Sequence, residues 1–394
     1  MKKIVAIFLV SVMFLTLVSC GGGDKDKEIP VEDIDPVEMM AIPPIYDLVF
    51  DFSEGLAVVS VGGKWGYIDK TGEEVIPLIY DMAFEFSEGL AVVGNGEMFG
   101  YIDKTGAEAL PFIYYRADSF SEGLAVVMPD DVESSYDAHL LYIDKEGNEI
   151  TPKYHSTEPF SEGMACVQRG IMNFVFIDKE GNEVIPLSDD RPNRKGRSFS
   201  EGLSLISDPF DVSGFMDKTG AIVIPLENIS SSIDVGDFSE GLASVERIGE
   251  SYSCYIDTTG AQVLDPIYNI ANEFTEGLAL VSFELEWCYI DRTGEVIIEG
   301  DDYQWAYDFN EGYAGVAKDG KVGFLNKEGE MVVPLIYEYP NWQDTAFDEM
   351  LEMDLITGES MMHEYKVSDG MAAVRVDGKW GFINIADWLK GEDQ

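Results

Sequence analysis

The sequence predicts an all-β protein made of nine tandem repeats. Residues 52–80 read FSEGLAVVSVGGKWGYIDKTGEEVIPLIY, and the rest of the chain repeats this pattern. Its Phe-Ser-Glu-Gly-Leu start recurs, closely or loosely, at Phe86, Phe120, Phe160, Phe199, Phe238, Phe274, Phe309 and Val367, so the units lie 34 to 58 residues apart. Self-similarity at such a period marks a repeat architecture. One unit cannot bury its apolar face alone, so packing between units must hold the chain together.

Each unit reads as a three-stranded β-meander. Residues 56–61 form a short apolar, β-branched run that is typical of a buried strand. The glycines at 62–63 suit a tight hairpin turn, and 65–69 alternate as a second strand. The following DKTG has the signature of a turn that ends in a left-handed glycine, and a third strand then runs to Pro77.

Two arrangements of the repeat domain, residues 41–394, fit this pattern. We expect an open superhelical, solenoid-like array, because propellers typically have about four to eight blades of four strands. Three strands per unit, nine copies and uneven spacings differ from that description. The alternative is a closed β-propeller, in which residues 42–46, which match the end of a unit, complete the last unit.

Residues 1–19 read as a secretory signal peptide. Two lysines precede an apolar run that is too short for an ordinary membrane-spanning helix. The run ends at Leu17, Val18, Ser19 and Cys20, which resemble the lipobox of bacterial lipoproteins. The resemblance implies cleavage before Cys20 and attachment of lipid to it. Residues 20–40, rich in Gly, Asp, Lys, Glu and Pro, then read as a flexible acidic tether.

The chain is strongly acidic, with a formal charge of −48. This charge disfavours nucleic acid and anionic lipid as partners, and it favours solubility. We therefore expect the protein to meet the membrane only through its lipid anchor, in the cell envelope or at the cell surface.

Three insertions distinguish the units from one another, near 129–139, 188–198 and 339–366. Insertions on one face of a repeat array often determine its partner. The second insertion contains a basic cluster and the third a tryptophan, so we treat Arg191, Arg194, Arg197 and Trp342 as candidate ligand contacts.

Cys254 and Cys288 occupy the same position in consecutive units. Two outcomes are open for this pair. The sulfurs could form a disulfide if the units stack in register in an oxidising compartment, or both could be buried free thiols.

The sequence contains no recognisable catalytic constellation. Glu54 recurs as Glu in eight of the nine units and as Asp369 in the last. A glycosidase needs one carboxylate pair and not nine. Acids that recur in every unit therefore indicate a structural role in turns. The histidines, His139, His155 and His363, have no zinc-like spacing. We expect no enzymatic activity, no metal and no cofactor.

Aromatic residues recur at the start of the second strand, as Trp65, Phe99, Trp287 and Trp380. If they face outward, they could form a ladder for sugar rings, so they are further candidate ligand contacts. If they face inward, they form the core between repeats, and this is the interpretation that we favour.

The repeated frame of SEGLA, YIDKTG and VIP resembles the WG-repeat family of bacterial proteins. The Trp-Gly pair that names the family is intact at Trp65-Gly66 and Trp380-Gly381. The resemblance implies an often exported, β-rich repeat protein that mediates interactions, and it supplies no catalytic residues. We expect a lipid-anchored, non-enzymatic scaffold for a protein or an envelope polysaccharide. The alternative is a carbohydrate-binding or carbohydrate-active protein that uses the aromatic and acidic repeat residues.

Overall fold

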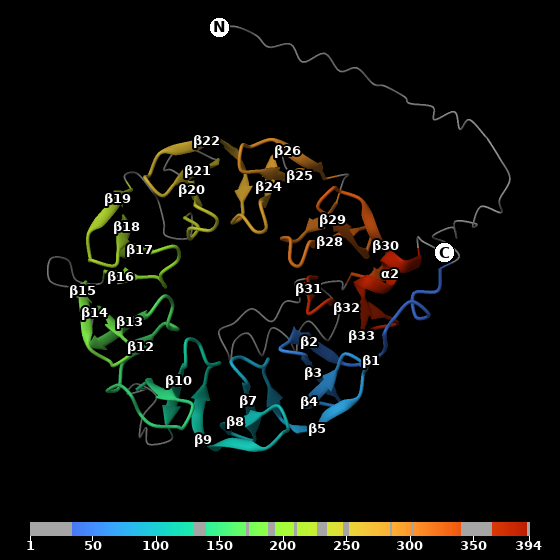
Figure 1. Ribbon diagram of the computed structural model, residues 1–394, viewed down its shortest axis with the longest axis horizontal. Coiled ribbons are helices and arrows are strands. Elements are labelled where there is room, and N and C mark those ends of the chain that lie inside the picture. The colour runs from blue at the N-terminus through green and yellow to red at the C-terminus, as the bar shows by residue number, and fades with distance from the viewer. Residues whose placement is uncertain are drawn as a thin grey trace, which may run out of the picture.

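The protein is a closed β-propeller. The computed structural model describes residues 34–129, 139–170, 173–187, 194–208, 211–226, 235–246, 252–283, 286–300, 303–339 and 365–391. In these ranges the chain forms strands and turns, with a short helix, α2 (Ile385–Gly391), after the last strand. Figure 1 shows the blades arranged in a ring.

A complete blade is a four-stranded antiparallel meander that runs from the centre of the ring to its rim (Figure 1). The inner strands are β2 (Leu48–Ser53), β6 (Met82–Ala83), β12 (Ser156–Thr157), β16 (Lys195–Gly196), β23 (Ile270–Ala271), β27 (Trp305–Ala306) and β31 (Val367–Ser368). The second strands are β3 (Leu56–Val61), β7 (Leu90–Asn95), β10 (Leu124–Pro129), β13 (Met164–Gly170), β17 (Leu203–Asp208), β20 (Leu242–Glu246), β24 (Leu278–Phe283), β28 (Tyr313–Lys318) and β32 (Met371–Val376).

The third strands carry the Trp-Gly position. They are β4 (Lys64–Asp69), β8 (Met98–Asp103), β11 (Leu141–Asp144), β14 (Asn173–Asp178), β18 (Asp211–Asp217), β21 (Ser253–Asp257), β25 (Glu286–Asp291), β29 (Lys321–Asn326) and β33 (Lys379–Asn384). The outer strands are β5 (Glu74–Tyr80), β9 (Glu108–Ala117), β15 (Glu183–Pro186), β19 (Ile222–Pro225), β22 (Gln262–Tyr268), β26 (Val296–Glu299), β30 (Met331–Glu338) and, in the last blade, β1 (Ile42–Tyr46).

The nine repeat units form eight hydrogen-bonded sheets, because β9 is shared. The start of β9 is the outer strand of the second blade, while its end pairs with β10 as the inner strand of the third. The resulting six-stranded sheet therefore contains two blades. In the sixth blade the inner strand shrinks to a bridge between Val235 and Val245.

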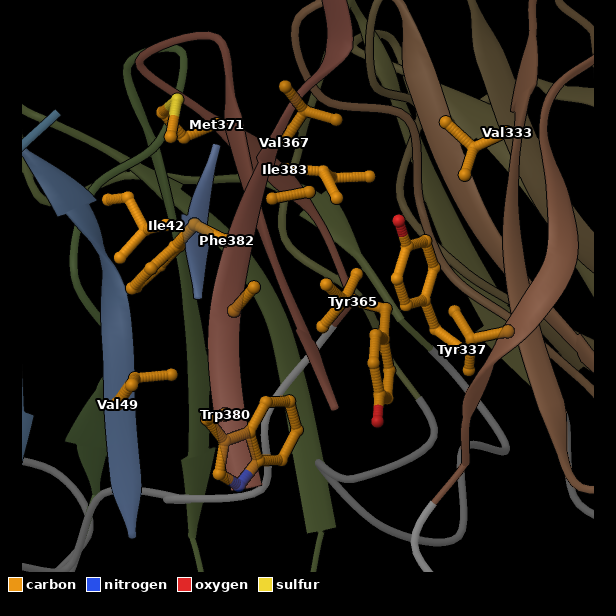
Figure 2. Packing of buried hydrophobic residues seen from close by; sticks show 14 of the residues in the cluster. Ile42, Val49, Val333, Tyr337, Tyr365, Val367, Met371, Trp380, Phe382 and Ile383 are labelled. Atoms are coloured by element: carbon orange, nitrogen blue, oxygen red, sulfur yellow. The ribbon is translucent and has the colours of Figure 1, made fainter. Parts of the chain in front are cut away.

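Closure of the ring corrects the open array that we favoured and confirms the alternative. Strand β1 pairs antiparallel with β33, so that Ile42 lies opposite Phe382 and Tyr46 opposite Trp380. Figure 1 places the blue β1 beside the red β33, and Figure 2 shows Ile42 packed against Phe382. The first strand of the chain thus completes its last blade.

The main core lies between neighbouring blades. In every third strand except β29, which precedes Val367, an aromatic residue packs against the phenylalanine of the next unit. Tyr67 packs on Phe86 in this way, with ring centroids 4.9 Å apart. The equivalent pairs are Tyr101–Phe120, Tyr142–Phe160, Phe176–Phe199, Phe215–Phe238, Tyr255–Phe274 and Tyr289–Phe309. Phe382 and Phe52, at 4.9 Å, continue the series across the closure. Burial of these rings is the main force that holds the blades together.

The meander gives the ring two different faces. One carries the turns between inner and second strands and those between third and outer strands, and we call it the acidic-turn face. The other, which we call the variable face, carries the second-to-third turns and the connections from each outer strand to the next blade. Figure 1 allows the strand order to be followed from blade to blade.

Candidate functional site

The repeated acids of the acidic-turn face are used to join the blades. Each Glu-Gly pair, such as Glu54-Gly55, has positive φ at both residues and forms a two-residue hairpin turn. The Glu54 carboxylate accepts a hydrogen bond from the N–H of Gly89 in the next blade, at 3.1 Å. The same bond joins Glu88 to Gly123, Glu122 to Gly163, Glu162 to Gly202, Glu201 to Gly241, Glu240 to Gly277, Glu276 to Gly312, Glu311 to Gly370 and Asp369 to Gly55. These nine bonds form a complete circle.

Lysines on the same face neutralise many of these carboxylates. Lys104 lies 3.0 Å from the Glu54 carboxylate and also donates to the Glu54 carbonyl at 2.8 Å. The equivalent ion pairs are Lys145–Glu88, Lys179–Glu122, Lys218–Glu162, Lys327–Glu276 and Lys70–Asp369. Burial by itself would raise the pKa of Glu122, but the hydrogen bonds from Lys179 and the Gly163 N–H outweigh it and lower that pKa.

The second repeated acid caps its own turn. One carboxylate oxygen of Asp69 accepts hydrogen bonds from the Thr71 hydroxyl at 2.6 Å, the Thr71 N–H at 2.9 Å and the Glu73 N–H at 3.0 Å. These bonds, above all the one from the Thr71 hydroxyl, lower the pKa of Asp69. Both repeated carboxylates therefore make turn and blade contacts, as the sequence suggested.

The variable face carries the differences between units. In the first unit, β3 and β4 are joined by two residues, whereas β10 and β11 of the third are separated by the insertion 129–139. The flanking residues of the other two insertions, after β15 and after β30, lie at the same face. This face, and not the uniform acidic-turn face, is the candidate functional site.

The predicted contacts from the insertions divide into three groups. Arg191 and Trp342 lie outside the described residues. Arg197 is engaged structurally, because it donates to the Val235 carbonyl at 2.9 Å and lies 3.5 Å from Asp237 in the next blade. Arg194 is half-buried beside strand β16.

The four aromatic candidates also differ in exposure. Trp65 and Trp380 are each 4% exposed and belong to the packed core, so they cannot present a flat face to a sugar. Phe99 and Trp287 are half-buried and pack against core clusters. The core interpretation therefore holds for two of the four, and Trp287 and Phe99 retain some accessible ring surface.

No disulfide joins Cys254 and Cys288 in this structure. Cys254 is buried and Cys288 half-buried, and each pairs with a valine of its own second strand. Burial raises the pKa of the Cys288 thiol, and the carboxylates of Glu286 and Glu299 add to this rise.

The described residues contain no cluster of three His, Cys, Asp or Glu side chains that could hold a metal ion. His139 and His155 lie with their rings 5.4 Å apart, beside the insertion 129–139. Within the same part of the chain, no helix has the length and apolar character needed to cross a membrane. The lipobox residues Leu17, Val18, Ser19 and Cys20 fall outside the described residues.

One aromatic cluster at the variable face was missed from the sequence. Tyr339 and Tyr365 flank the longest insertion, and their rings lie 5.9 Å apart. Tyr307 joins them, with its hydroxyl 3.3 Å from that of Tyr339. Tyr365 also packs 5.9 Å from Trp380, as Figure 2 shows. The signal was present, since two tyrosines bracket the insertion, but their contact depends on how the eighth and ninth blades pack together.

Several solved structures are similar to this chain. A eukaryotic initiation factor is 10% identical, with 76% of this chain and 90% of that chain covered and a TM-score of 0.50. BamB from Moraxella catarrhalis is 9% identical over 73% of this chain and 98% of its own, with a TM-score of 0.38. The dihydro-heme d1 dehydrogenase NirN is 13% identical over 82% of each chain, with a TM-score of 0.44. At these identities the likeness to the initiation factor concerns the fold alone.

Among curated proteins, no sequence matches this chain. The family described as "WG containing repeat" matches residues 34–65, 65–97, 99–131, 142–170, 214–249, 255–284, 287–321, 323–339 and 365–380. These matches cover more than half of the chain and follow the blades around the ring. The protein therefore belongs to the WG-containing-repeat family, and it carries those repeats as the blades of a closed propeller.

Proposed function

We propose that this protein is a lipid-anchored, non-enzymatic scaffold of the cell envelope, which binds a protein or an envelope polymer on its variable face. The observation that carries the proposal is the closed circle of hydrogen bonds on the opposite face. It occupies the repeated carboxylates of all nine units, from Glu54 to Asp369. The units differ from one another on the variable face, and such differences allow a face to select one partner over others.

The place where the chain enters the ring agrees with such an anchor. Strand β1 begins at Ile42, and Ile42 lies beside Gly72, in a turn of the acidic-turn face. A tether that joins the ring at this end of β1 would leave the variable face open to a partner. The lipid anchor itself rests on the sequence of Leu17 to Cys20.

The carbohydrate alternative now depends on fewer residues. Two of its four aromatic side chains, Trp65 and Trp380, are buried, and the repeated acids are hydrogen-bonded within the fold. Trp287 remains the best candidate for a sugar contact, because it is only half-buried whereas Trp65 and Trp380 lie in the core.

A pull-down tests the proposal and separates the two alternatives. The bait is the mature chain with Cys20→Ser, incubated with envelope protein, peptidoglycan and polysaccharide fractions. One variant lacks residues 340–364, and a control carries Glu146→Lys and Glu180→Lys, which are exposed on the acidic-turn face. A protein partner that the deletion loses and the control keeps supports the scaffold. A partner lost only in the control would overturn the assignment of the face, and polysaccharide retention abolished by Trp287→Ala would favour the carbohydrate alternative.

A further inference from the structure

Two of the chain's three histidines face each other at the variable face of the third unit. Leu140 and Tyr154 exchange a pair of backbone hydrogen bonds, of 2.8 and 2.7 Å. The next pair along these antiparallel segments is His139 and His155, which therefore lie directly opposite each other. Such a position, beside a hydrogen-bonded pair, brings the side chains of antiparallel segments closest together. The centroids of the two imidazole rings accordingly lie 5.4 Å apart.

Three other units hold a lysine and an acid at this cross-strand position. The pairs are Lys64–Asp81, Lys379–Asp47 and Lys321–Glu338. The first two are ion pairs, with 2.5 Å between the Lys64 ammonium and the Asp81 carboxylate. In the third unit both members are histidine. Two imidazoles cannot form an ion pair with each other, so this position has lost an attraction between strands and has gained two side chains that can bind a metal.

The backbone holds both histidines in place, while their rings are accessible. His155 donates its N–H to the Gln168 carbonyl of the fourth blade at 2.8 Å, and its neighbour Tyr154 is bonded to Leu140. His155 is exposed and His139 is half-buried. Among the residues that the structure describes, neither ring has a hydrogen-bond or ion-pair partner. Both imidazoles are therefore available to a ligand, on a backbone that is already ordered.

The spacing of the rings suits a shared metal ion. Neutral imidazole is a preferred ligand of Zn²⁺, Ni²⁺ and Cu²⁺, whereas Mg²⁺ and Ca²⁺ prefer oxygen. With zinc–nitrogen bonds of about 2.0–2.1 Å, two imidazole rings on one tetrahedral ion have their centres roughly 5 Å apart. The 5.4 Å between the centroids of His139 and His155 is close to this value. The acidic chain, with a formal charge of −48, also attracts cations.

We propose that His139 and His155 form a two-ligand site for a divalent transition-metal ion, of the class of Zn²⁺ and Ni²⁺. This inference goes beyond the scaffold function and does not depend on it. Two protein ligands leave coordination positions open, so water or a group of a bound partner completes the shell. The spacing of the histidines in the sequence did not reveal the pair, because they meet only where the outer segment returns beside β11.

Calorimetric titration with Ni²⁺ tests the site. The protein is the untagged mature chain with Cys20→Ser, in millimolar Mg²⁺ to occupy exposed carboxylates. We expect one Ni²⁺ per chain and a melting temperature that rises with Ni²⁺ concentration, because the ion binds the folded pair. Zn²⁺ should compete for the same site, whereas further Mg²⁺ should not. Because imidazole binds a metal only when it is neutral, binding should weaken between pH 7.5 and pH 5.5.

Three variants locate the ligands. His155→Ala should weaken Ni²⁺ binding by about tenfold or more, since one of two protein ligands is lost. His139→Lys combined with His155→Asp installs the pair of the other units. This variant should keep the melting temperature of the metal-free wild type and lose the response to Ni²⁺. His363→Ala removes the third histidine of the chain and is the matched control, with unchanged binding.

A transplanted pair tests whether the cross-strand position is sufficient. Met98 and Tyr115 hold this position in the second unit, since Phe99 pairs with Tyr114, and Tyr115 is exposed. Met98→His combined with Tyr115→His should therefore raise the stoichiometry from one Ni²⁺ per chain to two.

Four results would overturn the proposal. They are no saturable binding at millimolar Ni²⁺, equal affinity of the wild type and the Lys–Asp variant, binding that His363→Ala abolishes, or a transplanted pair that adds no ion. The scaffold function is tested separately by the pull-down, in which the deletion of 340–364 leaves His139 and His155 in place.

Discussion

The carboxylate of Asp369 accepts a hydrogen bond of 2.7 Å from the backbone N–H of Gly55, which lies 314 residues earlier in the chain. It is the same contact that every other turn acid makes with the following blade. At Asp369 it joins the last unit to the first, so the circle on the acidic-turn face is continuous. Ser368 supports it, because its hydroxyl donates to the Phe52 carbonyl at 2.6 Å.

The closing strand should contribute strongly to stability. Ile42 in β1 is fully buried against Phe382, so Ile42→Ala should lower the free energy of unfolding by about 2–4 kcal/mol. Ile45 in the same strand is 54% exposed, and Ile45→Ala is the matched control, with an expected change near zero. Urea denaturation measures both. Equal effects of the two substitutions would mean that β1 is not held in the ring.

Stability should fall in acid because of the turn carboxylates. The ion pairs and hydrogen bonds of Glu122 and Glu276 lower their pKa values in the folded state, against an opposing effect of burial. A lowered pKa stabilises the fold at pH values above the unfolded pKa, near 4.5, and this contribution disappears as the pH falls through the folded pKa. Glu122→Gln should therefore be less stable than wild type at pH 7, with a smaller difference at pH 3. Melting curves across this range test it, and a difference that grows in acid would contradict it.

The hydrogen bond from a tyrosine hydroxyl to the neighbouring blade should contribute about 1 kcal/mol to the free energy of unfolding. Tyr101 donates to the Asp118 carbonyl of the third blade at 2.8 Å, whereas four units have phenylalanine at this position, including Phe176 and Phe215. Tyr101→Phe should keep the packing and lose only the bond. Tyr115→Phe, at a residue 58% exposed, is the control and should leave chemical denaturation unchanged.

The thiols should differ in reactivity. Burial raises the pKa of Cys166 to about 12, so this thiol should stay unreactive in the folded protein at pH 8. Cys288 is less buried and should react first with a thiol reagent, and Cys288→Ser should remove this fast phase. Intact mass spectrometry of the alkylated protein follows the reaction. Failure of both Cys254 and Cys288 to react after denaturation without reductant would instead show that they form a disulfide.

Lipid attachment at Cys20 remains a prediction from the sequence. Cys20→Ser should move the protein from the membrane fraction to the soluble fraction and remove the mass of the lipid. Ser19→Thr, which keeps the cysteine, is a control for effects on export. An unchanged mass and fractionation in Cys20→Ser would rule out this anchor.

Much of the blade could be read from one unit. The second, third and outer strands lie where Leu56, Trp65 and Val75 predicted them, because hydrophobic pattern and turn residues are local signals. The inner strand was missed because it is often as short as Met82–Ala83, too short to show a period. Closure was predicted only as the alternative, because the rotation between blades is set by packing such as Phe382 on Phe52, which no single unit contains.

The site could be predicted in part. The structural role of the repeated acids followed from their repetition, and their bonds to the next glycine explain why Glu54 recurs. Unequal exposure of the aromatics did not follow, since Trp65 and Trp287 share a position yet differ in what covers them.

The pairing of β1 with β33 also means that the ring cannot close until both ends of the chain are present. These strands are separated by most of the chain, so their contact has a high sequence separation and a large entropic cost of loop closure. A chain that enters a new compartment with its N-terminus first must hold β1 without its partner until Asn384 has arrived. During that interval β1 and β33 each have an unpaired edge that is paired in the closed ring. For an exported protein, we therefore expect the moment of ring closure to be the step at which a folding helper matters most.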